Sequence, residues 1–237
     1  MVESMPWTSS TPRRRSASTS SNSGASTPMT RKHSGDPEFV GAVLIGGSSR
    51  RMGTDKALLA SAETGGLSLL RLAAGALNGA GAREVVAVGR SDTSLSGEGL
   101  RVIPDLWEGE GPLGGIVTAM SEVDSDEINH IVVLACDLLA PSSASIRALL
   151  ARAAKKPDHV VVPLVDGQHE WLHACWPLSL KPLLETAFED GLRAPRSLPD
   201  DIPVEEVTGI DPATTRDADT PGDLPWGLST PTDGPIG

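Results

Sequence analysis

Aromatic side chains and cysteines are scarce in this 237-residue chain, which has no tyrosine, two phenylalanines, five tryptophans and two cysteines. So few aromatic rings argue against a surface built for stacking nucleic-acid bases. Two cysteines cannot form a disulfide framework, and neither has a second cysteine at metal-ligand spacing. Cys136 and Cys175 instead lie in apolar stretches, which is typical of reduced core thiols in a cytosolic protein.

Long hydrophobic runs and an excess of positive charge are also missing. No apolar run approaches the roughly 20 residues that a membrane-spanning helix needs, so we expect a cytoplasmic protein without a membrane partner. The formal net charge of −11 argues against nonspecific binding of nucleic acid. It leaves open an anionic small substrate, which a local cluster of arginine and lysine can bind. The hydrophobic share of 39% is sufficient for a buried core.

Residues 1–37 have the composition of a tail. Ser, Thr, Pro and Arg dominate there with almost no apolar spacing, so we expect this segment to be disordered. An arginine- and serine-rich leader poor in acidic residues is also typical of organellar transit peptides, and translation could instead start at Met5 or Met29. We favour the solvated tail, followed by one domain over residues 38–228 and a flexible end at 229–237.

Apolar runs and helical patterns alternate from Phe39 onward. The patterns predict strands at 39–45, 84–89, 100–105, 130–137, 159–167, 169–177 and 203–210, helices at 68–81, 112–123, 142–156 and 178–190, and a turn or helix at 219–224. Asp166-Gly167 is a hairpin signal between two of the strands. This alternation predicts a three-layer α/β/α fold with a mostly parallel sheet and a small antiparallel excursion near 159–177. Ligands of such folds bind outside the carboxyl ends of the strands.

The stretch after the first predicted strand, "GGSSRRMGTDK" (46–56), combines glycines with basic side chains. Gly46, Gly47 and Gly53 would let a phosphate approach the backbone closely, and Arg51 and Lys56 would bind polyphosphate oxygens. The spacing fits neither a Walker A loop nor a dinucleotide-binding Gly-x-Gly-x-x-Gly. On composition alone, a surface turn with solvated arginines is an equally fair interpretation.

Two aspartates follow predicted strands. Asp137 ends the most apolar one, where a carboxylate is costly unless a cation or hydrogen bonds compensate. It is therefore either a metal ligand or the N-cap of the next helix, and the local pattern does not decide between them. Asp105 follows a proline, so an ordinary turn residue is the alternative to a ligand contact.

Four stretches form an ordered set of motifs. "LIGGSSRRMGTDK" (44–56) matches Leu-x-Gly-Gly-x-Ser-x-Arg-Met-Gly-x-Asp-Lys, and the others are "PDLWEGEGPLGGI" (104–116), "LACDLLAP" (134–141) and "DADTPGDL" (217–224). Together they resemble the nucleotidyltransferases that activate sugars and cofactors, most closely the molybdenum cofactor guanylyltransferases (the MobA-like family). The resemblance spans about residues 40–225. It departs from the family pattern at Leu139, where a proline is usual, and at Asp217 and Asp219, where the family has asparagines.

The resemblance implies a nucleotide-diphospho-sugar transferase-like fold and transfer of GMP from GTP to the terminal phosphate of molybdopterin, with release of pyrophosphate. It implies Mg²⁺ as cofactor, with Asp137 and Asp219 as metal ligands and Asp217 as the less favoured second carboxylate. Catalytic roles fall on Arg51, Lys56 and Asp137. The implied nucleotide-binding residues are Leu44, Ile45, Gly46, Gly47, Gly53, Lys56, Asp105, Gly111, Pro112, Leu113 and Asp137.

The acceptor site is harder to predict. His173, Arg193, Arg196 and Asp217 are its candidates, together with His169, although each histidine could simply be solvated. Trp171 and Trp176 could floor a pterin pocket, but core packing is the better interpretation. GTP and molybdopterin are the expected partners, with transient contacts to other cofactor-biosynthesis proteins or molybdoenzymes.

Three alternatives remain open. The glycine pairs of the first and second motifs favour guanine, because cytidylyl-transferring relatives resemble Ala-Ala-Gly at the first position; CTP is nonetheless the competing nucleotide. The acceptor could be another phosphorylated metabolite. A noncatalytic nucleotide-binding adaptor that delivers the cofactor is the non-enzymatic alternative.

Overall fold

The computed structural model describes residues 35–46, 56–60, 65–89, 95, 98–218 and 223–224. Both predicted tails therefore lie outside the described residues except for Gly35, Asp36 and Pro37, as does most of the turn predicted at 219–224. None of the helices in the described ranges has the length and hydrophobicity required to span a bilayer.

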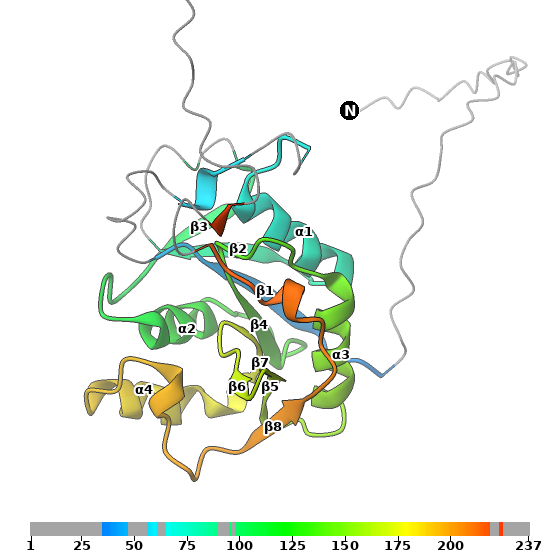
Figure 1. The fold of residues 1–237 in the computed structure, drawn as a ribbon. Helices are drawn as coiled ribbons and strands as arrows, with labels where there is room; N and C mark the ends of the chain where they lie inside the picture. The colour runs from blue at the N-terminus through cyan, green and yellow to red at the C-terminus, as the bar shows by residue number, and fades with distance from the viewer. Residues whose placement is uncertain are drawn as a thin grey trace, which may run out of the picture.

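An eight-stranded sheet forms the middle layer of the described part of the chain (Figure 1). Its strands are β1 (Phe39–Leu44), β2 (Val85–Gly89), β3 (Arg101–Pro104), β4 (His130–Ala135), β5 (Val160–Val165), β6 (Gln168–His169), β7 (His173–Pro177) and β8 (Val204–Val207). The order is β3-β2-β1-β4-β7-β5-β6, with β8 also paired to β5. Strands β3, β2, β1 and β4 are parallel, whereas β7 is antiparallel to both β4 and β5. The predicted α/β class, with its antiparallel excursion, is confirmed.

Helices cover both faces of the sheet. They are α1 (Leu69–Ala80), α2 (Pro112–Ser121), α3 (Ser143–Ala153) and α4 (Lys181–Glu189), and short 3-10 turns occur at Lys56–Leu58, Leu178–Leu180, Pro195–Ser197 and Pro212–Thr214. The side chain of Ser68 caps α1 and that of Ser142 caps α3 by accepting hydrogen bonds from backbone amides of the first turn. Gly81, with φ of 99°, ends α1 in the left-handed conformation that glycine adopts without strain.

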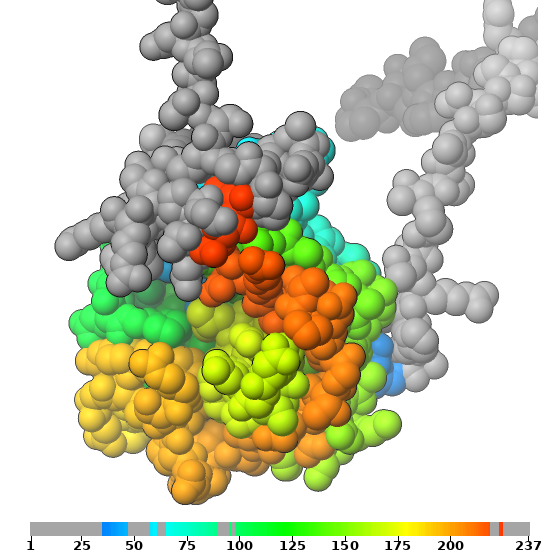
Figure 2. Space-filling model, viewed as in Figure 1, coloured from blue at the N-terminus to red at the C-terminus, as the bar shows by residue number. Residues whose placement is uncertain are grey.

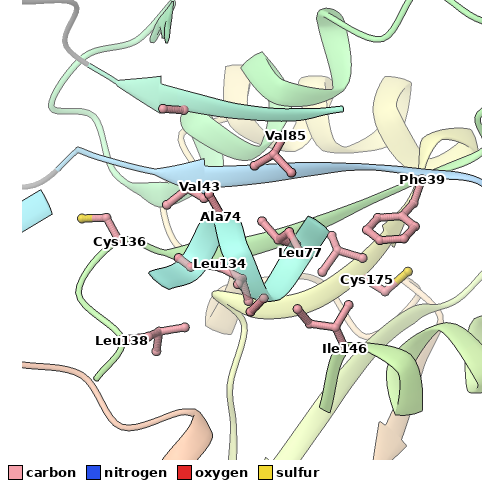
Figure 3. Close-up of a cluster of buried hydrophobic side chains, with 14 of the residues drawn as sticks. Phe39, Val43, Ala74, Leu77, Val85, Leu134, Cys136, Leu138, Ile146 and Cys175 are labelled. Atoms are coloured by element: carbon pink, nitrogen blue, oxygen red, sulfur yellow. The ribbon is translucent and has the colours of Figure 1, made fainter. Parts of the chain in front are cut away.

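Two hydrophobic cores lie on opposite sides of the sheet. One packs the sheet against α1 and α3 through Phe39, Leu77, Leu134 and Ile146 (Figure 3). The other packs it against α2 and α4. Cys136 and Cys175 are both buried and form no disulfide, in line with the prediction of core thiols.

The sequence prediction is correct at the hairpin and wrong just beyond it. Asp166 (φ 50°) and Gly167 (φ 78°) both have positive φ, as a two-residue type I′ turn between β5 and β6 requires. The strand predicted at 169–177 is interrupted, because β6 ends at His169 and β7 begins at His173. The intervening carbonyl of Leu172 accepts a hydrogen bond from the amide of Ala135 at 2.9 Å, so the chain joins β4 here, and β7 then lies between β4 and β5.

The helix predicted at 178–190 also divides, into a 3-10 turn and α4. Pro182 explains the boundary, because proline lacks an amide hydrogen and is tolerated only in the first turn of an α-helix. Lys181 is therefore the first residue of α4.

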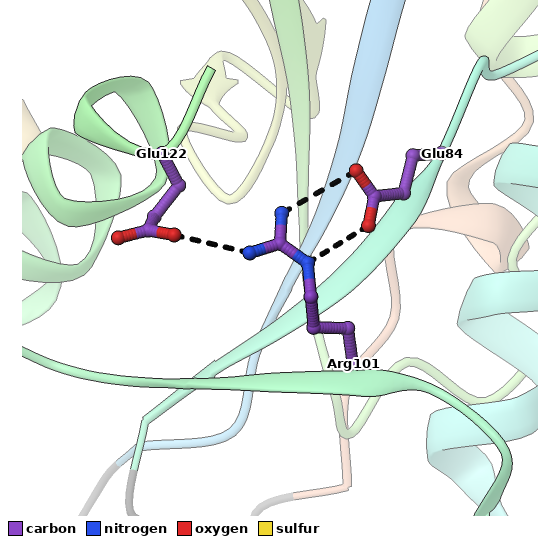
Figure 4. A network of polar contacts seen from close by, with 3 residues as sticks. All are labelled: Glu84, Arg101 and Glu122. Carbon is purple, nitrogen blue, oxygen red and sulfur yellow. Dashed lines mark hydrogen bonds and ion pairs between the residues drawn. The ribbon is translucent and has the colours of Figure 1, made fainter. Parts of the chain in front are cut away.

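An ion-pair network lies at the edge of the sheet where the parallel strands begin (Figure 4). The Arg101 guanidinium donates to both carboxylate oxygens of Glu84, at 2.8 and 3.3 Å, and to Glu122 at 3.0 Å. These three side chains are hydrogen-bonded to one another, and the two carboxylates outnumber the single guanidinium.

Candidate active site

The carboxyl-terminal edge of the sheet carries a cavity of about 920 Å³. Its walls come from the ends of β1 and β4, the loops at 105–112 and 135–138, the segment 168–173, and residues 194–196, 215 and 217. Strands β2 and β3 lie on one side of β1, and the chain then returns to β4 on the other side. Ligands bind at such a topological switch point in open α/β sheets. In Figure 2 the yellow-green β5–β6 hairpin lies between the gold α4 region and the orange C-terminal segment.

The start of the first motif lines the cavity. Leu44, Ile45 and Gly46 lie on the wall, and the chain is held there because the Ile45 amide donates to the Val88 carbonyl at 2.8 Å. The Cys136 amide donates to the Leu44 carbonyl at 3.2 Å, which joins the ends of β1 and β4.

The middle of that motif lies outside the described residues. Gly47, Arg51 and Gly53 are among these residues, and their predicted roles remain predictions. Lys56 is described by its backbone, which opens the 3-10 turn Lys56–Leu58.

Asp105 occupies the cavity wall at the end of β3 in a fixed orientation. Its Oδ1 accepts hydrogen bonds from the Thr118 hydroxyl at 3.0 Å and from the Trp107 amide at 3.1 Å. The Asp105 amide in turn donates to the Gly89 carbonyl at 3.0 Å. Thr118 is a residue that the sequence prediction missed, although a threonine within an apolar helix could have drawn attention.

Gly111 and Pro112 line the cavity at the start of α2. Gly111 has φ of 103°, and a Cβ atom there would lie 2.7 Å from the Arg193 carbonyl oxygen. That carbonyl also accepts a hydrogen bond from the Leu113 amide at 3.1 Å, whereas the Leu113 side chain is fully buried and faces the core. Glycine is therefore needed at position 111 for two independent reasons, backbone conformation and close approach.

Arg193 lies beside the cavity. Its guanidinium stacks on the Phe188 ring at 4.2 Å, donates to the Phe188 carbonyl at 2.7 Å and pairs with Glu110 at 2.8 Å. These contacts tie the segment after α4 to the loop before α2. The predicted contact of Arg193 with an acceptor would require the guanidinium to leave them.

Three further carboxylates, those of Asp137, Glu170 and Asp217, line the cavity. Asp137 follows β4, and a bridge between Leu138 and Asp217 brings the C-terminal segment beside it. The Ala218 amide donates to the Asp137 carbonyl at 3.0 Å. Glu170 also lines the cavity, and its pKa is raised mainly by burial and further by the negative charges of Asp217 and Asp166. Sequence reasoning overlooked Glu170.

Oxygen donors of this kind fit Mg²⁺, which is typically held by one or two carboxylates together with substrate phosphates and water. Within the described ranges, no group of three or more His, Cys, Asp or Glu side chains has the arrangement of a complete protein-made metal site. A cation here would therefore need ligands from the substrate. Asp219 lies outside the described residues.

The remaining acceptor candidates differ in their surroundings. Arg196 is exposed on the cavity wall. His169 lines the cavity while its Nε2 lies 2.7 Å from a Glu206 carboxylate oxygen, and its ring meets Trp171 edge-on at 5.2 Å. Trp171 is half-buried on the wall, whereas Trp176 is fully buried in the core, as core packing predicts.

His173 is a buried neutral residue at the edge of the cavity. It is 1% exposed, and burial lowers the pKa of its imidazole to about 4. The Ser145 hydroxyl donates to the Ser142 carbonyl at 2.7 Å, so the His173 Nε2 nitrogen, 2.9 Å from that hydroxyl, acts as the donor toward it. Any contact of His173 with an acceptor near neutral pH would therefore be that of an uncharged group.

A mostly parallel α/β sheet with a ligand-sized cavity at its switch point is the arrangement of the nucleotide-diphospho-sugar transferase-like fold. Residues 41–201 match the MobA-like NTP transferase domain. The chain belongs to this family.

Curated relatives agree with that assignment. The chain is 36% identical over 156 residues to a probable molybdenum cofactor guanylyltransferase of Opitutus terrae, covering 66% of this chain and 75% of that protein. It is 34% identical over 160 residues to the molybdenum cofactor guanylyltransferase of Rhizobium leguminosarum, covering 66% and 72%.

Among solved structures, molybdopterin-guanine dinucleotide biosynthesis protein A of Archaeoglobus fulgidus superposes with a TM-score of 0.63 at 24% identity, covering 78% of this chain and 94% of that one. A Thermus thermophilus cytidylyltransferase acting on 2-C-methyl-D-erythritol 4-phosphate gives a TM-score of 0.54 at 15% identity, covering 78% and 95%. These two similarities establish the fold.

Proposed function

We propose that this protein is a molybdenum cofactor guanylyltransferase, which transfers GMP from GTP to the terminal phosphate of molybdopterin. A phosphate oxygen of the acceptor would attack the α-phosphorus of GTP. A new P–O–P bond forms, the bond between the α-phosphorus and the bridging oxygen breaks, and pyrophosphate leaves. The names of the relatives support the substrates. The observation that carries the proposal is that residues of all four motifs and of the acceptor stretch line one cavity.

Positioning and charge neutralisation provide most of the catalysis in such transfers. We infer that the backbone at Leu44–Gly46 and Gly111 approaches the nucleotide closely and that Asp105 accepts a hydrogen bond from it. Arg51 and Lys56 would bind the triphosphate and stabilise the departing pyrophosphate. Loss of either contact is expected to lower the rate by about 10²–10³.

Asp137 would hold Mg²⁺, with Asp219 or Asp217 as the second carboxylate. The bound cation would supply neutralisation of the phosphate charge during transfer. Supporting this assignment, Asp137 and Asp217 line the same wall on adjoining segments of chain. The pKa of Glu170 is raised partly by the charge of Asp217, so negative charge accumulates on this wall and favours a cation.

The acceptor would occupy the end of the cavity formed by segments 168–173 and 194–196. Arg196 is the described cation there, and the half-buried face of Trp171 offers an apolar surface to a flat ring. The predicted cytoplasmic location and the transient protein partners remain predictions.

Incubation with GTP, Mg²⁺ and molybdenum cofactor tests the proposal. We expect release of pyrophosphate and formation of the guanine dinucleotide cofactor. Asp137→Asn should abolish most turnover, whereas the matched variant Asp200→Asn, at an exposed position outside the cavity, should retain it.

Other outcomes would redirect the assignment. Efficient turnover of CTP instead of GTP would move the protein to cytidylyl transfer, and pyrophosphate release only with another phosphorylated metabolite would change the acceptor. Unchanged cellular function of a folded Lys56→Ala variant would support a noncatalytic adaptor and refute the proposal.

A further inference from the structure

Thr118 is a buried polar residue that the proposed mechanism does not use. It is 1% exposed in α2, where neighbours such as Ile116, Val117 and Ala119 belong to the core. Burial of a hydroxyl is costly unless it is hydrogen-bonded. Thr118 is bonded twice, because its oxygen donates to Asp105 Oδ1 at 3.0 Å and accepts from the Leu106 amide at 3.2 Å.

The two oxygens of the Asp105 carboxylate have different surroundings. Oδ1 receives both the Thr118 hydroxyl and the Trp107 amide. Oδ2 lies on the side of Gly115, where an added Cβ atom would be 3.8 Å away, and both residues line the cavity. Among the described residues, Oδ2 has no hydrogen-bond partner, so it is the carboxylate oxygen that is left to accept a hydrogen bond from a ligand.

We propose that Thr118 is a positioning residue for nucleotide binding. It locks the Asp105 carboxylate so that Oδ2 accepts a hydrogen bond from an N–H or O–H donor of the bound nucleoside. This inference rests on the proposed function, in which Asp105 contacts GTP. Without the Thr118 hydroxyl the carboxylate can rotate, and ordering it on binding costs affinity.

Removal of the hydroxyl isolates this effect. Thr118→Val keeps the shape of the side chain, and we expect it to weaken GTP binding about five- to tenfold, the effect of losing one hydrogen bond. The loss should appear in the KM for GTP, with kcat changed less. Thr118→Ser should restore affinity, because serine provides the same hydroxyl.

A matched control is available on α4. Thr186 is exposed, and its hydroxyl donates to the Pro182 carbonyl of its own helix at 3.0 Å. Thr186→Val makes the same chemical change away from the cavity and should leave GTP binding unaltered.

Asp105→Asn provides a second test that does not depend on the folding of Thr118→Val. The Thr118 hydroxyl and the Trp107 amide both donate to the Oδ1 position, so the asparagine must place its amide oxygen there. Its amide nitrogen then takes the position of Oδ2. A donor then opposes the donor of the nucleoside, and we expect a loss of tenfold or more in GTP affinity.

Titration calorimetry with GTP and Mg²⁺ on the full chain and these variants decides the matter. If Thr118→Val or Asp105→Asn binds GTP with the same affinity as the unsubstituted protein, the role of Thr118 is overturned. The proposed function would still stand. Failure of the unsubstituted protein to bind GTP would overturn the proposed function, and the inference with it.

Discussion

Acid is expected to destabilise this protein through His173. The imidazole is buried against Ser145, and its pKa falls from the ordinary value of about 6.5 to about 4 in the folded chain. The unfolded chain therefore binds more protons than the folded chain between these two values. Stability from this residue is fully present above about pH 6.5 and is lost progressively as the pH falls toward 4.

The magnitude follows from the two pKa values. Each unit of difference corresponds to about 1.4 kcal/mol, and most of the interval is crossed by pH 5. We expect the free energy of unfolding to fall by about 2 kcal/mol between pH 7.5 and pH 5 because of His173 alone. Burial also lowers the pKa of His130 and so acts in the same direction, whereas the raised pKa of Glu170 acts in the opposite one.

Comparison with His173→Gln removes these other contributions. Urea unfolding of both proteins at several pH values should give curves that converge as the pH falls, since glutamine does not titrate. His159→Gln, just before β5, controls for the loss of a histidine outside this contact. Parallel curves for wild type and His173→Gln would refute the reasoning, because they would mean that His173 protonates without cost.

Three further predictions concern packing. Gly111→Ala should destabilise the protein by about 1–3 kcal/mol more than Gly109→Ala in urea unfolding, because both have positive φ but a methyl group only at position 111 meets a carbonyl 2.7 Å away. Gly41→Ala brings a methyl group within 2.9 Å of the Leu77 side chain and should cost about 1–3 kcal/mol of unfolding free energy. The additional cost of Gly41→Ala should be smaller when it is made in a Leu77→Ala background. Burial raises the pKa of the Cys175 thiol, so this cysteine should react with a disulfide reagent in guanidinium and not in the native protein.

Local sequence patterns predict most of the sheet and its helices, because apolar periodicity and capping residues act over a few positions. Asp166-Gly167 predicts its hairpin for the same reason: the two residues by themselves favour the turn. The break between β6 and β7 was not predictable in this way, since it depends on the Ala135 amide, a partner from a distant strand. The same limit applies to the site. No short pattern shows that Thr118 fixes Asp105.

The motif resemblance reaches further than periodicity, because it implies that residues distant in sequence act together. It selected Asp137 with Asp219, and Asp217 as the less favoured second carboxylate; Asp137 and Asp217 both line the cavity, and a bridge joins Leu138 to Asp217. It did not select Glu170, whose position follows from the chain leaving β6 just before it. Such residues become visible only when the strands are assembled.

The charge of the cavity constrains how it can bind a nucleotide. Its described lining residues include four carboxylates, those of Asp105, Asp137, Glu170 and Asp217. Among the same described residues, Arg196 is the one with a basic arginine or lysine side chain. A triphosphate entering such a site brings several more negative charges, and like charges at close range disfavour binding. Cations must therefore enter with the nucleotide or come from outside the described wall, which is where Arg51 and Lys56 are predicted to act. We therefore expect nucleotide affinity to depend on a cation, because the acidic wall disfavours a triphosphate that arrives without one.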